Sequence, residues 1–158
     1  ANNMDSMFLN AREFDQDISS WNVANVTDMC CMFSGANEFN KDILSWNVAN
    51  VTNMSEMFGE AFKTGMSGMF CEANVTDMSC MFSGATTFNK DISSWNVANV
   101  TDMSYMFYGA TAFNQDISSW NVANVNVANV TGMARMFNRA TTFNQNLIKI
   151  FHHGMLQM

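Results

Sequence analysis

The sequence repeats itself about every 25 residues, and this period constrains the fold more than any other feature. Trp21 and Trp46 are 25 residues apart, and so are Trp95 and Trp120. A typical unit is TDMSYMFYGATAFNQDISSWNVANV at 101–125, and units begin near residues 2, 27, 52, 76, 101 and 131. A unit this short cannot bury its own apolar side. We therefore expect about six stacked units in a single domain, 1–158.

Three regions depart from the period. The unit at 52–75 is irregular, because it is one residue short and lacks the Trp. Residues 126–130 are a five-residue insertion, which repeats the phrase Asn-Val-Ala-Asn-Val of 121–125. We interpret this insertion as a tolerated loop that bulges outward, with the burial of Val127 the least certain, because lengthening a loop costs little. Residues 146–158 leave the pattern and are expected to form a C-terminal cap or tail.

The two halves of a unit have different apolar spacing. In the first half, Met103, Met106, Phe107 and Ala110 follow the spacing i, i+3, i+4, i+7, which predicts a helix of two turns. Thr101 precedes this segment as an N-cap, Asp102 suits the positive end of a helix, and Gly109 is a plausible stop.

The second half predicts a strand. Ile117, Trp120 and Val122 form I-x-x-W-x-V, with Asn121 directed the other way between two apolar neighbours. With one short helix and one short parallel strand per 25-residue coil, the predicted fold is an α/β repeat solenoid of leucine-rich-repeat type.

Several phrases resemble known repeats. The I-x-x-W-x-V pattern in DISSWNV resembles the L-x-x-L-x-L strand signature of leucine-rich repeats. More narrowly, FNKDISSWNVANVTDMSYMF at 88–107 resembles the repeat of BspA-like bacterial surface proteins and lipoproteins, which have about 25 residues per repeat. The resemblance covers nearly the whole chain and rests on Trp-Asn-Val, Val-Thr-Asp-Met and Met-Phe. It implies display at a cell surface, with adhesion or host-interaction roles, and it carries over no catalytic residues.

Methionine, cysteine and histidine are the candidate metal ligands. Equivalent methionines such as Met103 and Met106 recur in every unit, and their Met-x-x-Met spacing suits soft copper(I). We favour core packing, because these methionines share a stripe with phenylalanine. His152 and His153 are adjacent in the tail and do not predict a metal site. The four cysteines lack C-x-x-C spacing and are expected to be free thiols (Cys30, Cys31, Cys71 and Cys80). No cofactor is predicted.

A column of aspartates precedes the predicted strand, at Asp17, Asp42, Asp91 and Asp116. Stacked carboxylates repel one another, and a bound calcium ion would relieve that repulsion. The alternative is that each aspartate accepts a hydrogen bond from a backbone amide of its own turn. We favour the turn role and leave the cation open.

Two sets of polar residues recur in the second half of the unit. Asn-Val-Thr occurs five times as a formal glycosylation sequon, but we expect its Asn to bond from coil to coil and its Thr to cap a helix. The alternation of a strand turns a row of small polar residues outward, as a small, neutral and flat candidate contact face. Its members are Ser20, Asn22, Ser45, Asn47, Ser94, Asn96, Ser119 and Asn121.

Composition and charge narrow the function. The formal charge of −7 and the lack of a basic cluster argue against nucleic acid, and no apolar run is long enough to insert into a membrane. No histidine lies in a repeat and no glycine-rich phosphate loop occurs, so we do not expect an enzyme. Because the chain begins at Ala1 within the pattern, we expect a processed form or a piece of something longer.

The resulting expectation is a structural or adhesive interaction module of a surface or secreted protein, which binds protein or glycan outside the cell or at its surface. Two alternatives stay open. One is an architectural subunit that contacts neighbouring subunits of a larger assembly. The other is an ice-binding solenoid, which the repetitive Ser/Asn face suggests.

Overall fold

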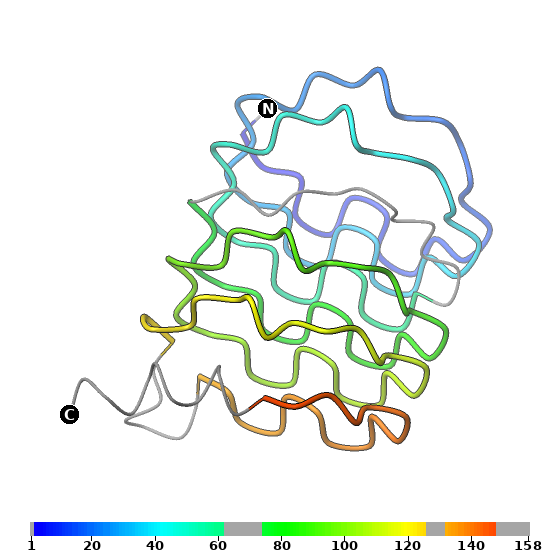
Figure 1. The fold of residues 1–158 in the computed structure, drawn as a ribbon. Coiled ribbons are helices and arrows are strands. Elements are labelled where there is room, and N and C mark those ends of the chain that lie inside the picture. The colour runs from blue at the N-terminus through cyan, green and yellow to red at the C-terminus, as the bar shows by residue number, and fades with distance from the viewer. Residues whose placement is uncertain (1, 62–73, 126–131, 148–158) are drawn as a thin grey trace.

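The computed structural model describes residues 2–61, 74–125 and 132–147 of the chain. The chain winds into coils, and the coils lie one on another in chain order, from the blue first coil at one end to the orange last coil at the other (Figure 1). Backbone hydrogen bonds join residues one repeat apart, such as Thr52 N to Thr27 O at 2.9 Å and Thr101 N to Thr76 O at 2.8 Å. The repeat therefore sets the length of one coil.

The predicted helix and strand are absent from the part of the chain that the structure describes. That part contains no α-helix, and its β-pairing is limited to isolated parallel bridges. The prediction of an α/β solenoid of leucine-rich-repeat type is therefore wrong. Thr101 caps no helix and Gly109 ends none. Each coil is built from turns.

The first half of a coil is a run of overlapping turns. In the fifth coil, the amides of Met106, Tyr108 and Ala110 donate to carbonyls three residues earlier, at 3.0 to 3.2 Å. The amides at the odd positions 103, 105, 107 and 109 donate instead to carbonyls of the sixth coil at 2.6 to 2.9 Å. An α-helix bonds its amides within itself, four residues back. The ladder to the next coil takes every second amide, so a helix cannot form.

Left-handed residues make these turns possible. Tyr105 has a φ of 56° and Gly109 a φ of 67°, and positive φ at the third residue defines a type II turn. The place of Tyr105 holds no glycine in any described coil and is occupied by Ser6, Cys31, Glu56, Cys80, Tyr105 and Arg135. This conformation costs an L-residue about 1–2 kcal/mol. Local preference therefore opposes the turn, and the ladder and the core stabilise it.

The segment predicted as a strand also consists of turns. Trp120 N donates to Ile117 O at 3.0 Å, and Val125 N donates to Val122 O at 3.0 Å. The parallel bridges lie elsewhere, at the residue that follows the recurrent Thr, and they pair Asn3, Asp28, Asn53, Asp77 and Asp102 in succession. Corners of turns, rather than the pleat of a strand, direct Ile117, Trp120 and Val122 inward.

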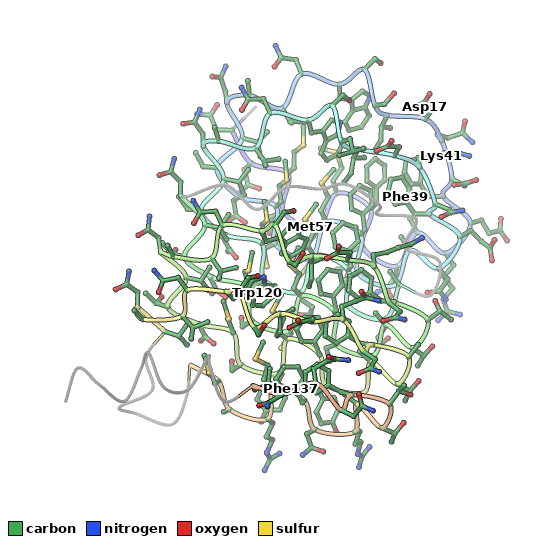
Figure 2. All side chains as sticks on the ribbon, viewed as in Figure 1. Asp17, Phe39, Lys41, Met57, Trp120 and Phe137 are labelled. Carbon is green, nitrogen blue, oxygen red and sulfur yellow. The ribbon has the colours of Figure 1, made fainter. Side chains whose placement is uncertain are left out.

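Two columns of phenylalanine rings run along the core. Phe8, Phe33, Phe58, Phe82, Phe107 and Phe137 stack at 5.5 to 5.9 Å between ring centroids. In five coils a second ring lies 3.9 to 4.2 Å from the first, as Phe113 does from Phe107. Figure 2 shows Phe39, Met57 and Trp120 inside the stack, with Asp17 and Lys41 at its edge. The apolar positions of the repeat are thus core positions, although the elements that carry them are not those predicted.

Three sequence features lie wholly or mostly outside the described residues. The insertion at 126–130, with Val127, is one of them, as are much of the irregular unit at 52–75 and nearly all of the tail at 146–158. Their predicted roles stay predictions.

Candidate interaction faces

The predicted contact face is exposed, but turns rather than a strand expose it. All eight of its residues have exposed side chains: Ser20, Asn22, Ser45, Asn47, Ser94, Asn96, Ser119 and Asn121. Each asparagine accepts a hydrogen bond from the backbone amide two residues later, at 3.1 to 3.2 Å. The hydroxyls of Ser45 and Ser119 donate to carbonyls of the preceding coil. These bonds hold this Ser/Asn face rigidly, and its role in contacts stays a prediction.

The aspartate column has the turn role. Asp17, Asp42, Asp91 and Asp116 each accept a hydrogen bond from the amide two residues later, at 2.8 to 2.9 Å. The amide and hydroxyl of Ser93 hold the pKa of Asp91 below its ordinary value, and Ser19 does the same for the pKa of Asp17. Every member thus has the turn hydrogen bond that we favoured over a cation site.

The asparagine of Asn-Val-Thr bonds from coil to coil, as predicted. Asn50 Nδ2 donates to Ala24 O at 2.8 Å, and Asn74 Nδ2 donates to Ala49 O. The threonine role was predicted wrongly, because the described residues that follow these threonines form turns and no helix. The hydroxyl of Thr101 donates to Thr76 O of the preceding coil at 3.2 Å. These side chains fasten adjacent coils together.

The methionine and cysteine predictions have separate outcomes. Met103 and Met106 are fully buried in the core, which confirms the core packing that we favoured for them. Cys30, Cys31 and Cys80 are free thiols, as expected. Cys71, His152 and His153 lie outside the described residues.

A second exposed surface differs from coil to coil. It is made by the outward side chains of the overlapping turns in the first half of each coil, which we call the turn ladder. The sixth coil has Arg135 and Arg139 there, and the fifth has Tyr105 and Tyr108. The Arg135 guanidinium carbon lies 5.8 Å from the centre of the Tyr105 ring, and that of Arg139 lies 5.6 Å from the Tyr108 ring. The two tyrosine rings are 5.7 Å apart. We call these four residues the Tyr–Arg patch.

We did not predict the Tyr–Arg patch from the sequence, because we compared the positions at which the repeat units agree. The core position of Phe107 is phenylalanine in all six units, whereas the outward position of Tyr105 is Ser, Cys, Glu, Cys, Tyr and Arg in turn. Variation at one outward position against a constant core is the signal that identifies this face. The equivalence of Tyr105 and Arg135 also predicts that they stack, since they occupy the same place in adjacent coils.

Nothing in the described part of the chain forms a helix long and apolar enough to cross a membrane. No curated protein and no solved structure matches the chain. One protein family does match, over residues 1–68 and 62–153, and it is described as "Mycoplasma protein of unknown function, DUF285". These two matches span nearly the whole chain, and we conclude that the chain belongs to the DUF285 family.

Proposed function

We propose that the chain is a non-catalytic interaction module of a BspA-like surface protein, and that it binds a negatively charged protein or glycan through the Tyr–Arg patch. The observation that carries this proposal is the contrast between the two kinds of position in the repeat. The core position of Phe107 holds phenylalanine in every unit, while the outward position of Tyr105 differs from coil to coil, and two Tyr–Arg pairs lie side by side.

The chemistry of the patch supports binding. Tyrosine and arginine are enriched among the residues that dominate binding energy at protein interfaces. A cation held over an aromatic ring contributes about 0.5–1 kcal/mol at an exposed site, so each pair is ordered before a partner arrives. The chain as a whole carries a charge of −7. Its net field therefore disfavours an acidic partner over much of the surface, and the two adjacent cations Arg135 and Arg139 favour contact at this patch.

The BspA-like assignment and the surface location are supported by the family match and the repeat phrases rather than by the Tyr–Arg patch. The DUF285 match covers the same residues as the phrases Trp-Asn-Val, Val-Thr-Asp-Met and Met-Phe. Those phrases resemble BspA-like repeats, which belong to surface proteins. We therefore propose an extracellular or cell-surface location. Digestion of the protein by a protease added to intact cells supports this location, and full protection until the cells are lysed refutes it.

Binding is tested with two matched variants. The purified chain is applied to an array of acidic and neutral glycans, and beads coated with it are applied to host and neighbouring cells. Replacing Tyr105 and Tyr108 by alanine is expected to weaken binding at least about tenfold, which is the effect of losing about 1.4 kcal/mol. The control replaces Ser20 and Ser94 of the Ser/Asn face by alanine and is expected to bind like the parent chain.

Three outcomes contradict the proposal. If the serine variant loses binding and the tyrosine variant does not, the Ser/Asn face is the contact surface. If binding does not weaken as salt rises, the partner is not recognised by charge. If no glycan and no cell is bound at any concentration tested, the adhesive role is wrong and a purely structural role remains.

A further inference from the structure

Two thiols and a carboxylate meet on the turn ladder of the first two coils. Cys30 Sγ and Cys31 Sγ are 3.3 Å apart. A carboxylate oxygen of Asp5 and these two sulfur atoms all lie within 4.8 Å of one another. Cys30 and Cys31 are half-buried and Asp5 is exposed. Across the described ranges, this is the one group of three cysteine, histidine or acidic residues whose ligand atoms come so close.

The third coil adds a further oxygen ligand. Glu56 occupies the place of Cys31 one coil later, and its Oε2 atom lies 3.7 Å from Cys31 Sγ. Stacking thus brings one carboxylate from each side onto the thiol pair. We propose that Asp5, Cys30, Cys31 and Glu56 form a binding site for a thiophilic divalent cation of the class of Zn²⁺.

The ligand set suits such an ion. Zinc binds four ligands in a tetrahedron, with bonds of about 2.3 Å to cysteine sulfur and about 2.0–2.2 Å to carboxylate oxygen. Neighbouring ligand atoms are then about 3–4 Å apart. The two sulfur atoms are 3.3 Å apart, and the Asp5 oxygen lies within 4.8 Å of both. Glu56 Oε2 lies 3.7 Å from Cys31 Sγ, and a rotation of its exposed side chain would bring it to the ion as the fourth ligand.

The charge of the cluster also favours a cation. The carboxylates of Asp5 and Glu56 bring negative charge beside the thiol pair, and this charge attracts a cation. Binding releases the two thiol protons to solvent and displaces water from the ion, without any change in oxidation state.

A disulfide between the two cysteines is not an alternative use of the pair. Residues joined by a trans peptide have Cα atoms about 3.8 Å apart. A disulfide normally needs about 4.4–6.8 Å between its Cα atoms. A disulfide between adjacent cysteines is therefore strained and easily reduced, which favours the dithiol and leaves both sulfur atoms available to an ion.

The test is a titration of the reduced, metal-free chain with Zn²⁺ by calorimetry. A second titration uses Cd²⁺ and follows the ultraviolet absorption band of cadmium bound to thiolate. We expect one ion per chain and the release of two protons. Cys31→Ser is expected to lower the affinity at least about 100-fold, and Glu56→Gln about tenfold, by comparison with the 10–100-fold effects of losing groups that support a metal site.

Cys80 provides the matched control. It occupies the same place in the fourth coil, with a φ of 56° against 54° for Cys31, but Ser79 precedes it in place of a second thiol. Cys80→Ser is therefore expected to bind both ions like the parent chain. Unfolding of every variant without metal shows whether a loss of affinity reflects a loss of fold.

The proposal is overturned by any of four results. They are no binding by the parent chain, equal affinity of the folded Cys31→Ser variant, a loss of binding in Cys80→Ser, and one ion shared between two chains as shown by light scattering.

Discussion

Replacing Gly109 by alanine tests the left-handed conformation on which the turns in the first half of a coil depend. Gly109 has a φ of 67°, and a Cβ added to it meets nothing closer than Gly84 backbone atoms at 3.9 Å. The substitution therefore changes the backbone preference and adds no clash. It is the mildest substitution that tests the left-handed conformation on its own.

The expected magnitude follows from two opposing effects. A left-handed backbone costs an L-residue about 1–2 kcal/mol. Alanine also has less freedom than glycine in the unfolded chain, which returns about 0.4–1 kcal/mol. The free energy of unfolding should therefore fall by about 1 kcal/mol. At a right-handed position in the interior of an α-helix the same change would raise it by about 0.8–1.0 kcal/mol, so the sign of the change reports whether the backbone at Gly109 is left-handed.

Urea unfolding followed by tryptophan fluorescence measures this difference. A gain in stability for Gly109→Ala refutes the turn ladder. Gly35→Ala is the companion variant, because its added Cβ also lies 2.5 Å from Asn10 Oδ1 and 3.3 Å from Asn10 Cα. It should destabilise the chain more than Gly109→Ala does, and Asn10→Gly should remove the excess. An equal cost at both glycines contradicts the close approach of the first two coils.

Three further changes test the core, the coil contacts and the turns. Phe107→Ala removes a fully buried ring from the continuous column and should lower the free energy of unfolding by about 3–5 kcal/mol, measured in urea. Trp120→Phe removes the indole donor that bonds Ile92 O at 3.0 Å and should cost about 1–3 kcal/mol in the same assay. Asp91 should titrate below the ordinary 3.8 in nuclear magnetic resonance, because the Ser93 amide stabilises the carboxylate. Its contribution to stability is then present above the unfolded pKa and is lost as the pH falls through the lower, folded value.

Matched controls accompany these changes. Phe14→Ala alters a half-buried ring of the first coil and should cost less than Phe107→Ala, and equal costs would contradict the continuous core. Trp21→Phe alters an indole that is 38% exposed and should change stability by less than about 0.5 kcal/mol. Added calcium should leave the melting temperature unchanged, because amides rather than an ion satisfy the aspartates. A rise on adding calcium would restore the cation hypothesis.

The sequence predicted the inward positions more reliably than the elements that carry them. Met103, Met106, Phe107 and Ala110 are all buried, as their spacing predicts. That spacing occurs in a helix of 3.6 residues per turn, and it also occurs in overlapping four-residue turns. Periodicity alone could not separate the two. Non-glycine residues such as Tyr105 at positive φ carried no turn signal either, because local preference disfavours them.

The candidate sites divide in a similar way. The turn role of Asp91 and the coil-to-coil bond of Asn50 were predictable, since each depends on its own repeat and the next. Tyr105 and Arg135 are 30 residues apart, rather than 25, because the five-residue insertion lies between them. Their equivalent positions in adjacent coils are recognised only when the insertion is left out of the count. The approach of Asp5 and Glu56 to the thiol pair depends on which side chains the turns direct outward.

The sequence by itself determined the length of a coil, the composition of the core and the small polar side chains that fasten the coils. These follow from a repeated pattern of apolar and hydrogen-bonding residues, which acts within one repeat or between neighbours. Only the tertiary structure decided where the backbone amides donate. Each amide can bond within its own segment or to the next coil, and stacking every second amide onto the next coil satisfies the backbone while it buries the phenylalanine columns. That choice belongs to the assembled stack, because no single repeat contains both partners.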